Sequence, residues 1–240
     1  MAETLPTASL SARARLVMAF ILAFGIAALQ NLVALPIAVA LAIGALVCAP
    51  ERRAVLYRLR PAALLALMFL IVLPFITSGE TLVQSGPLRI TKEGAHASML
   101  IAGRMMVIVT LVMVLLAPVS AFRLVGALRA LGLPALIADL AMLTLRYLDE
   151  VTAELQRARV ARALRGGATG LRGLPDHALL LATSLIRAQI RAERLWAAMR
   201  LRGYGMRHGT LPTPLAMRDW TAIAGTGAVA LALVALDRSL

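Results

Sequence analysis

Long apolar runs separated by short charged segments fill the first half of the chain. The first run covers residues 16–48 and holds 33 residues without a charge. As one helix it would be roughly 50 Å long at 1.5 Å per residue, which exceeds a hydrocarbon core of about 30 Å. Gln30 and Asn31 lie near its middle, where a turn is expected. The pattern therefore predicts two short, tilted membrane spans over residues 11–29 and 32–49.

Three further apolar runs cover residues 62–77, 97–120 and 220–236. The arginine-rich segment 51–60 is interpreted as a cytoplasmic loop, because arginine accumulates on that side of a membrane protein. The polar, turn-rich segment 78–95 has nearly balanced charges and is interpreted as an outside loop. The chain is thus predicted to cross the membrane five times, with its C-terminal end outside.

Arg104 lies about two turns inside the fourth predicted span. An arginine near the centre of a bilayer costs about 2.5–3.5 kcal/mol on insertion scales. One interpretation is that this side chain extends to the outer interface. The other is that it contacts a partner subunit or a polar cavity, and the sequence leaves both open.

Residues 122–218 differ from the rest, because they hold 15 arginines against six acidic residues and yet keep apolar positions at helical spacing. Two long amphipathic helices are predicted, over residues 139–164 and 176–201. Glycines stop the first helix. Steps of three and four residues on the second helix predict a packing seam against the first, at the cytoplasmic surface of the membrane. The seam residues are Ala178, Leu181, Leu185, Ala188, Ala192, Leu195 and Met199.

Composition supports an all-α, polytopic membrane protein. Hydrophobic residues make up 60% of the chain and charged residues only 15%, whereas soluble domains are about a quarter charged. The net charge of +13 fits arginine-rich cytoplasmic segments better than nucleic-acid binding, because aromatic residues are only 4% of the chain. The expected organisation is four spans in residues 1–118, a cytoplasmic helix region in 119–217 and a last span in 218–240.

The sequence shows no arrangement of residues that predicts catalysis, a cofactor or a metal site. Cys48 is the only cysteine, the three histidines are far apart, and no GxxxxGK[ST], GxSxG or HExxH motif occurs. Asp149, Glu150 and Glu154 share one predicted helix and could suggest a carboxylate site. Ion pairs along the helix, such as Glu154 with Arg157, explain these acids more simply.

The two amphipathic helices end in the same tripeptide, Leu-Arg-Gly, at residues 164–166 and again 37 residues later at 201–203. We call these two tripeptides the signatures. A guanidinium group suits capture by an acidic groove, and the following glycine ends the helix and leaves room for a partner's backbone. A more general explanation is that arginines near helix C-termini interact with the helix dipole and with lipid phosphates. The candidate partner-binding residues are Leu164, Arg165, Gly166, Leu201, Arg202 and Gly203.

Several segments, in order along nearly the whole chain, resemble the transmembrane T component of energy-coupling factor (ECF) transporters, in particular the CbiQ type of cobalt importers. In that family each signature usually reads Ala-Arg-Gly, and here leucine replaces the alanine in both. The first signature could also be placed at Ala161-Arg162-Ala163. The segments that carry the resemblance are Gly86-Pro-Leu-Arg-Ile-Thr-Lys-Glu-Gly94, Leu131-Gly-Leu-Pro134, Arg146-Tyr147 with Asp149-Glu150, the Arg-Ala-Arg run before Leu164-Arg165-Gly166, and Ala198-Met-Arg-Leu-Arg-Gly-Tyr-Gly205.

The resemblance implies a non-catalytic subunit of the bacterial inner membrane. Its two amphipathic helices would be coupling helices, with each signature arginine in a groove of one subunit of a cytoplasmic ATPase dimer. A separate membrane S component, with a small accessory membrane protein, would bind the transported ion. That ion would be Co²⁺, while nickel or a vitamin stays open.

Two other function classes fit less well. A conventional ABC permease would carry a single coupling loop ending in Leu-Pro, whereas this chain has two helical arms. A membrane enzyme, for example of lipid metabolism, would need clustered acids or a nucleophile.

Overall fold

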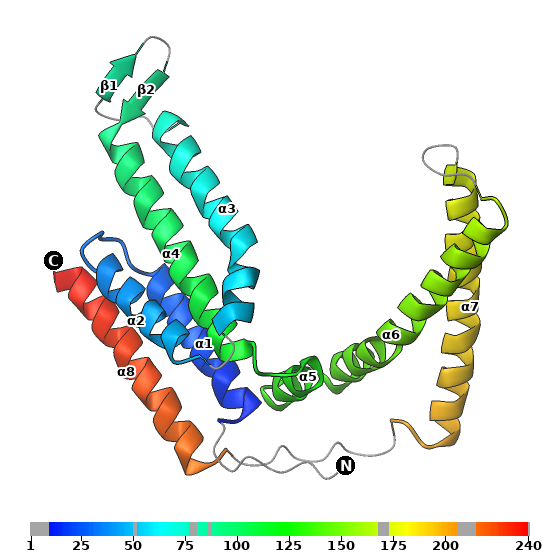
Figure 1. The fold of residues 1–240 in the computed structure, drawn as a ribbon. Coiled ribbons are helices and arrows are strands. Elements are labelled where there is room, and N and C mark those ends of the chain that lie inside the picture. Colours follow the sequence, from blue (N-terminus) through cyan, green and yellow to red (C-terminus); the bar gives the residue numbers. More distant parts are fainter. Residues whose placement is uncertain are drawn as a thin grey trace. The chain divides into compact units, whose positions relative to one another are not determined.

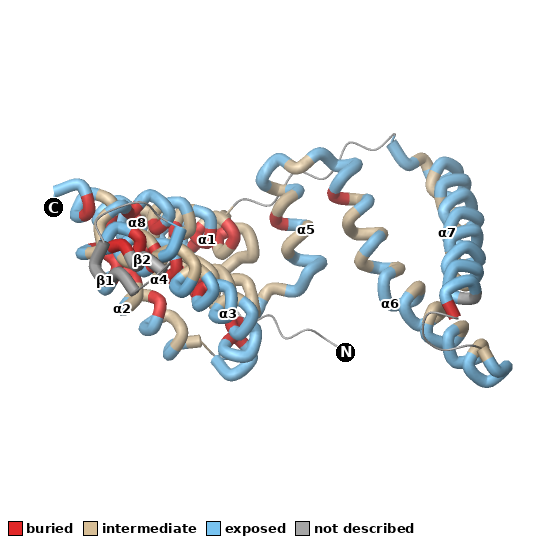
Figure 2. Tube along the Cα trace, turned by 90° about the horizontal axis from the view of Figure 1, so that it is seen from above, coloured by how far each residue is buried: buried red, intermediate tan, exposed pale blue. Residues whose placement is uncertain are grey.

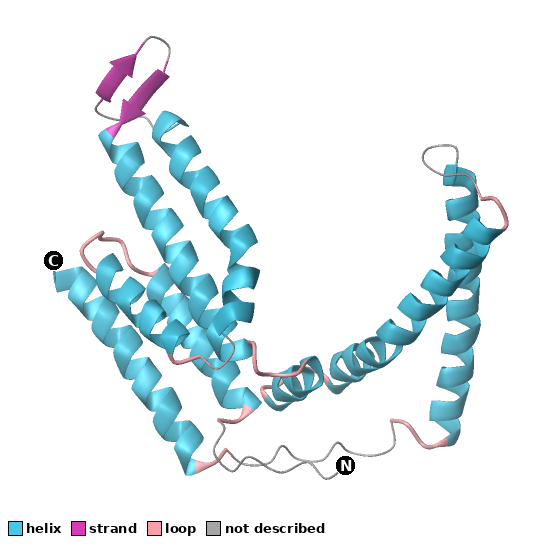
Figure 3. Cartoon of the chain, viewed as in Figure 1, coloured by secondary structure: helices cyan, strands magenta, loops and turns pink. Residues whose placement is uncertain are grey.

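The computed structural model describes residues 10–49, 52–76, 81–85, 88–167, 173–205 and 215–239. The prediction of an all-α membrane protein is confirmed, and the strands in this part of the chain form one short hairpin (Figures 1 and 3). The chain divides into unit 1, Met1–Leu131 with Pro214–Leu240, and unit 2, Gly132–Thr213. The elements are α1 (Ala12–Ala27), α2 (Leu35–Val47), α3 (Arg52–Ile76), β1 (Thr81–Ser85), β2 (Leu88–Thr91), α4 (Lys92–Leu116), α5 (Ala121–Ala130), α6 (Ala135–Leu164), α7 (Leu174–Leu201) and α8 (Met217–Ser239).

Helices occupy all five places where membrane spans are predicted. Among the described residues, α3, α4 and α8 are long and apolar enough to cross a membrane. The first two helices have 16 and 13 residues. At 1.5 Å per residue they are about 24 and 20 Å long, shorter than a core of about 30 Å. Crossing by α1 and α2 therefore stays a prediction.

Two segments read as loops have regular structure instead. Residues 52–60 belong to α3, because arginine, leucine and alanine favour a helix and the guanidinium group of Arg60 lies 4.6 Å from the ring centroid of Tyr57. The helix continues through Pro61. Strands β1 and β2 occupy part of the predicted outside loop and pair in antiparallel register. Helix α4 begins earlier than expected, because the Thr91 hydroxyl accepts a hydrogen bond from the amide of Gly94.

The core of unit 1 lies between α1, α2, α4 and α8. Figure 2 shows buried residues gathered in these helices, whereas most positions of α6 and α7 are exposed. A methyl group added at Gly25 of α1 would come within 2.9 Å of the Ala230 side chain of α8, so small residues let these helices approach closely. The buried core residues are Leu22, Ile26, Leu29, Ala34, Ala38, Ala42, Val107, Leu111 and Leu233.

Two buried carboxylates fix the direction of α8 against α1. Asp219, near the start of α8, accepts a hydrogen bond from the amide of Ser11. Asp237, near its end, accepts bonds of 2.7 and 2.9 Å from the amides of Gln30 and Asn31. The two helices therefore run parallel. This direction agrees with the predicted topology, in which both run from the inside to the outside.

The side chain of Arg104 reaches the end of α1, which is the outer end in the predicted topology. Its Nη1 donates hydrogen bonds of 2.9 and 2.7 Å to the carbonyls of Ala27 and Leu29. These carbonyls belong to the end of α1, where the helix itself leaves acceptors without partners. Arg104 of α4 therefore caps the end of α1, and Asp237 of α8 binds the amides that follow in the same α1–α2 connection.

Candidate functional site

Unit 2 contains the two predicted arginine-rich helices as α6 and α7. Their C-terminal ends fall at Leu164 and Leu201, as the sequence predicts, while both helices begin a few residues earlier than expected. Polar contacts tie the start of α7 to the end of α6, and the end of α7 to the start of α6. The two helices are therefore antiparallel.

The two signatures form the same backbone cap. Gly166 and Gly203 have φ angles of +79° and +74°, a left-handed conformation that glycine adopts without strain. Each glycine amide bonds to the carbonyl three residues earlier, and the next amide bonds to the carbonyl five residues earlier. This is the Schellman arrangement, which satisfies the last carbonyls of a helix through the backbone alone. The arginine side chains are therefore not needed to end the helices.

The residues before the two glycines face outward. Leu164 and Leu201 are 84% and 90% exposed, and Arg165 and Arg202 are exposed as well. Neither guanidinium group makes a hydrogen bond or ion pair with another described residue. Because α6 and α7 are antiparallel, the two arginines lie at opposite ends of unit 2, about one helix length or roughly 40 Å apart. The structure thus keeps all six predicted residues accessible and separates them into two places.

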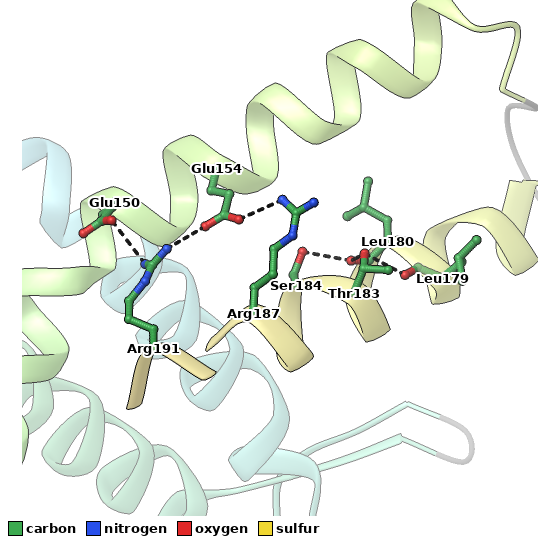
Figure 4. A network of polar contacts seen from close by, with 8 residues as sticks. All are labelled: Glu150, Glu154, Leu179, Leu180, Thr183, Ser184, Arg187 and Arg191. Atoms are coloured by element: carbon green, nitrogen blue, oxygen red, sulfur yellow. Dashed lines mark hydrogen bonds and ion pairs between the residues drawn. The ribbon is translucent and has the colours of Figure 1, made fainter. Parts of the chain in front are cut away.

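Arginine–glutamate contacts hold α6 and α7 together near their middles (Figure 4). Arg187 binds Glu154 at 3.1 Å, and Arg191 binds Glu154 at 3.0 Å and Glu150 at 3.3 Å. The expected pairing of Glu154 with Arg157 on the same helix is wrong, because α7 brings two arginines to this carboxylate. The hydrogen bonds from Arg187 and Arg191 lower the pKa of Glu154 below its usual range.

Each end of the helix pair has its own polar contact. Nη2 of Arg162 donates to the carbonyl of Gly173 at 3.3 Å, and Nη1 lies 3.0 Å from the Nδ1 atom of His177. At the opposite end, the Tyr204 hydroxyl donates to Asp139 at 2.8 Å. The Arg162 contacts therefore join the two helices beside the first signature, and the Tyr204 contact joins them directly after the second.

The seam predicted along α7 is only partly correct. Leu181 and Leu185 are 57% and 74% exposed, and Ala178 is exposed as well, so this half does not pack against α6. In this half the two helices are joined by polar contacts, from Arg162 to Gly173 and from Arg187 to Glu154. In the other half, the seam residues line an open groove of about 350 Å³ against α6. They are Ala188, Ala192, Leu195 and Met199.

Sequence reasoning missed the roles of Arg187, Arg191, Asp219 and Asp237. A one-dimensional pattern does not show which arginine meets a given glutamate on another helix. The described part of the chain holds no group of three or more His, Cys, Asp or Glu side chains that could bind a metal ion. Two of the three acids considered as a carboxylate site, Glu150 and Glu154, are bound to arginines.

The family comparison covers both helical arms. The model of the family described as CbiQ, cobalt transport protein, matches residues 5–211 and so includes both signatures. No curated protein matches the chain. The match spans most of the chain, and the apolar helices α3, α4 and α8 are those expected of a membrane component. The chain belongs to the CbiQ family of cobalt transport proteins.

Proposed function

We propose that this chain is the energy-coupling subunit of an ATP-driven ECF-type importer in the bacterial inner membrane. It links a cytoplasmic ATPase dimer to a membrane S component, which binds the transported ion. A small accessory membrane protein accompanies the S component. Membership of a cobalt transport family favours Co²⁺ as that ion, over nickel or a vitamin. The ion is cargo of the complex and binds to the S component.

The two exposed signature arginines carry this proposal. Arg165 and Arg202 end two helices in the same backbone geometry, and the structure gives neither side chain a partner among the described residues. A guanidinium group keeps its charge and offers donors in a fixed fork that matches a carboxylate. Two arginines at the ends of identical helix caps, one helix length apart, match two equivalent grooves on an ATPase dimer.

In the proposed mechanism, α6 and α7 act as levers. ATP binding closes the ATPase dimer and moves its two grooves, and each groove carries one signature with it. The ion pairs in the middle of α6 and α7 hold the two levers together, so that movement at one signature is transmitted to the other. They join Arg187 and Arg191 to Glu150 and Glu154. The chain itself performs no ATP hydrolysis, which belongs to its partners.

Charge reversal at both signatures tests the proposal. We expect a chain carrying Arg165→Glu and Arg202→Glu to insert into the membrane normally and to lose the ATPase subunits during membrane purification. The paired control is Arg159→Glu with Arg194→Glu, two exposed arginines of the same helices outside the signatures. Full retention of the ATPase by the signature variant would contradict the proposal.

A conventional ABC permease is the alternative function. It would bind the transported ion within its own spans and dock its ATPase through one loop. Transport of the ion by this chain and the ATPase subunits without any S component would favour the permease, whereas transport that requires the S component supports the proposed function.

A further inference from the structure

A concave, positively charged basin lies between α6 and α7 beside the first signature. Its volume is about 730 Å³, and Arg157, Arg162 and Arg165 of α6 line it together with Arg187 of α7. We call this the cationic basin. Glu154 is the one acidic residue among the described residues that line it.

That single carboxylate does not neutralise the cationic basin. Glu154 already accepts hydrogen bonds from Arg187 and from Arg191, which lies outside the basin. The Arg162 side chain is turned toward the start of α7. The structure gives Arg157 and Arg165 no hydrogen bond or ion pair with any other described residue. At least two arginine charges in one hollow therefore face solvent.

A hollow lined by one sign of charge attracts the opposite sign more strongly than a flat surface does. Arginine forks bind carboxylates through two parallel hydrogen bonds. Gly166 and Gly167 form part of the wall and carry no side chain that would block an approaching backbone. The basin is therefore shaped for a projecting acidic segment of a protein, and its concavity fits the flat surface of a lipid bilayer less well.

The described residues beside the second signature form a different kind of hollow. The groove near Arg202 is apolar in character, and its walls include Leu195, Trp196, Met199 and Tyr204. The same backbone cap therefore stands in two different chemical surroundings. A partner that contacts both ends meets charge at the first and apolar side chains at the second.

We infer that the cationic basin receives an acidic segment of the ATPase subunit that binds the first signature. This inference rests on the proposed function and adds to it a reciprocal contact: Arg165 enters the ATPase, and an acidic segment of the ATPase enters this chain. Docking at the first signature then depends on salt concentration more than docking at the second.

The test compares two arginines two residues apart on α6. Arg157 lines the basin, whereas Arg159 is exposed and points about 200° away around the helix. The full chain in lipid nanodiscs is titrated with the ATPase subunits that copurify with it, at low and high sodium chloride. We expect Arg157→Glu to raise the dissociation constant about tenfold at low salt and to flatten its salt dependence. Arg157→Lys should recover most of the affinity.

The control decides between a specific contact and general charge attraction. We expect Arg159→Glu to change the dissociation constant less than twofold. Equal losses for Arg157→Glu and Arg159→Glu would overturn the basin as a docking site, as would unchanged binding by Arg157→Glu. A further arm measures binding to vesicles with and without phosphatidylglycerol. An effect of Arg157→Glu confined to the anionic vesicles would assign the basin to lipid and overturn the inference. Failure of the wild-type chain to bind any ATPase would instead defeat the proposed function.

Discussion

Two sets of charged residues, one in each unit of this molecule, are used in opposite ways. In unit 1, Arg104, Asp219 and Asp237 bond to backbone amides and carbonyls within the unit. In unit 2, backbone hydrogen bonds cap both arms, and Arg165 and Arg202 stay exposed. This difference indicates which arginines are available to a partner. Charge bound to the chain's own backbone stabilises the fold, and charge that the backbone leaves unused is available for binding.

Removal of either signature arginine should give the largest effect. We expect Arg165→Ala and Arg202→Ala each to weaken ATPase binding by about 2 kcal/mol or more, or roughly thirtyfold, as for central arginines of protein interfaces. The thermal unfolding midpoint of the detergent-solubilised chain should not change. Titration with the ATPase and thermal unfolding of the same preparations check both statements. A lowered unfolding midpoint would mean that these side chains stabilise the fold, and would contradict their assignment as arginines that serve binding alone.

The opposite result is expected for Arg104. Arg104→Ala leaves the carbonyls of Ala27 and Leu29 without their donor, at a cost of about 1–3 kcal/mol of stability. We expect a lower unfolding midpoint and an unchanged dissociation constant for the ATPase. Both bonds come from the single nitrogen Nη1, so Arg104→Lys keeps the charge and one donating nitrogen on a shorter side chain and should recover part of the stability. An unaltered midpoint in Arg104→Ala would show that the cap contributes nothing.

The two glycine caps should respond alike. Alanine at Gly166 or Gly203 must adopt a positive φ, which costs about 1–2 kcal/mol. We expect either helix end to fray and ATPase binding to weaken by about fivefold to tenfold, with faster hydrogen exchange limited to the last turn of that helix. Gly126→Ala in α5 is the control, because a side chain there meets nothing within 4 Å and its φ is not positive. Weaker ATPase binding by only one of the two alanine variants would show that the two caps do not contribute equally.

The smallest expected effect is the acid response of the arms. Because hydrogen bonds from two arginines lower the pKa of Glu154, this carboxylate binds a proton less readily in the folded arms than in the unfolded chain. The stabilisation is complete above the usual pKa of a glutamate, about 4.3, and is lost as the pH falls through the lower folded value. Hydrogen exchange in α7 should therefore stay constant from neutral pH down to about 5 after correction for the intrinsic rate. A protection that declines near neutral pH would contradict this assignment.

The local features of the arms could be predicted from the sequence, because neighbouring residues decide them. The ends of α6 and α7 depend on glycines directly after helical runs, and Gly166 and Gly203 take the expected conformation. The apolar runs likewise predict the helices of unit 1. Segment 52–60 was misread because the positive-inside pattern indicates a side of the membrane and does not distinguish a loop from a helix.

Contacts between distant residues could not be predicted. The partners of Glu154 lie more than 30 positions away on another helix, and several arginines of α7 had equal claim to it. Arg104 was recognised as unusual, but its acceptors are backbone carbonyls, which every residue of the sequence provides. The exposed half of the α7 seam shows the same limit, since apolar spacing marks a face of a helix without saying how closely another helix approaches it.

Site-directed crosslinking tests directly whether both signatures contact the ATPase. In a Cys48→Ala background, a single cysteine at position 165, 202 or 159 is labelled with a benzophenone maleimide and irradiated in the assembled membrane complex. We predict crosslinks to an ATPase subunit from Arg165→Cys and from Arg202→Cys, and few from Arg159→Cys. Crosslinks from position 159 equal to those from both signatures, or none from either signature while the ATPase is bound, would contradict this prediction.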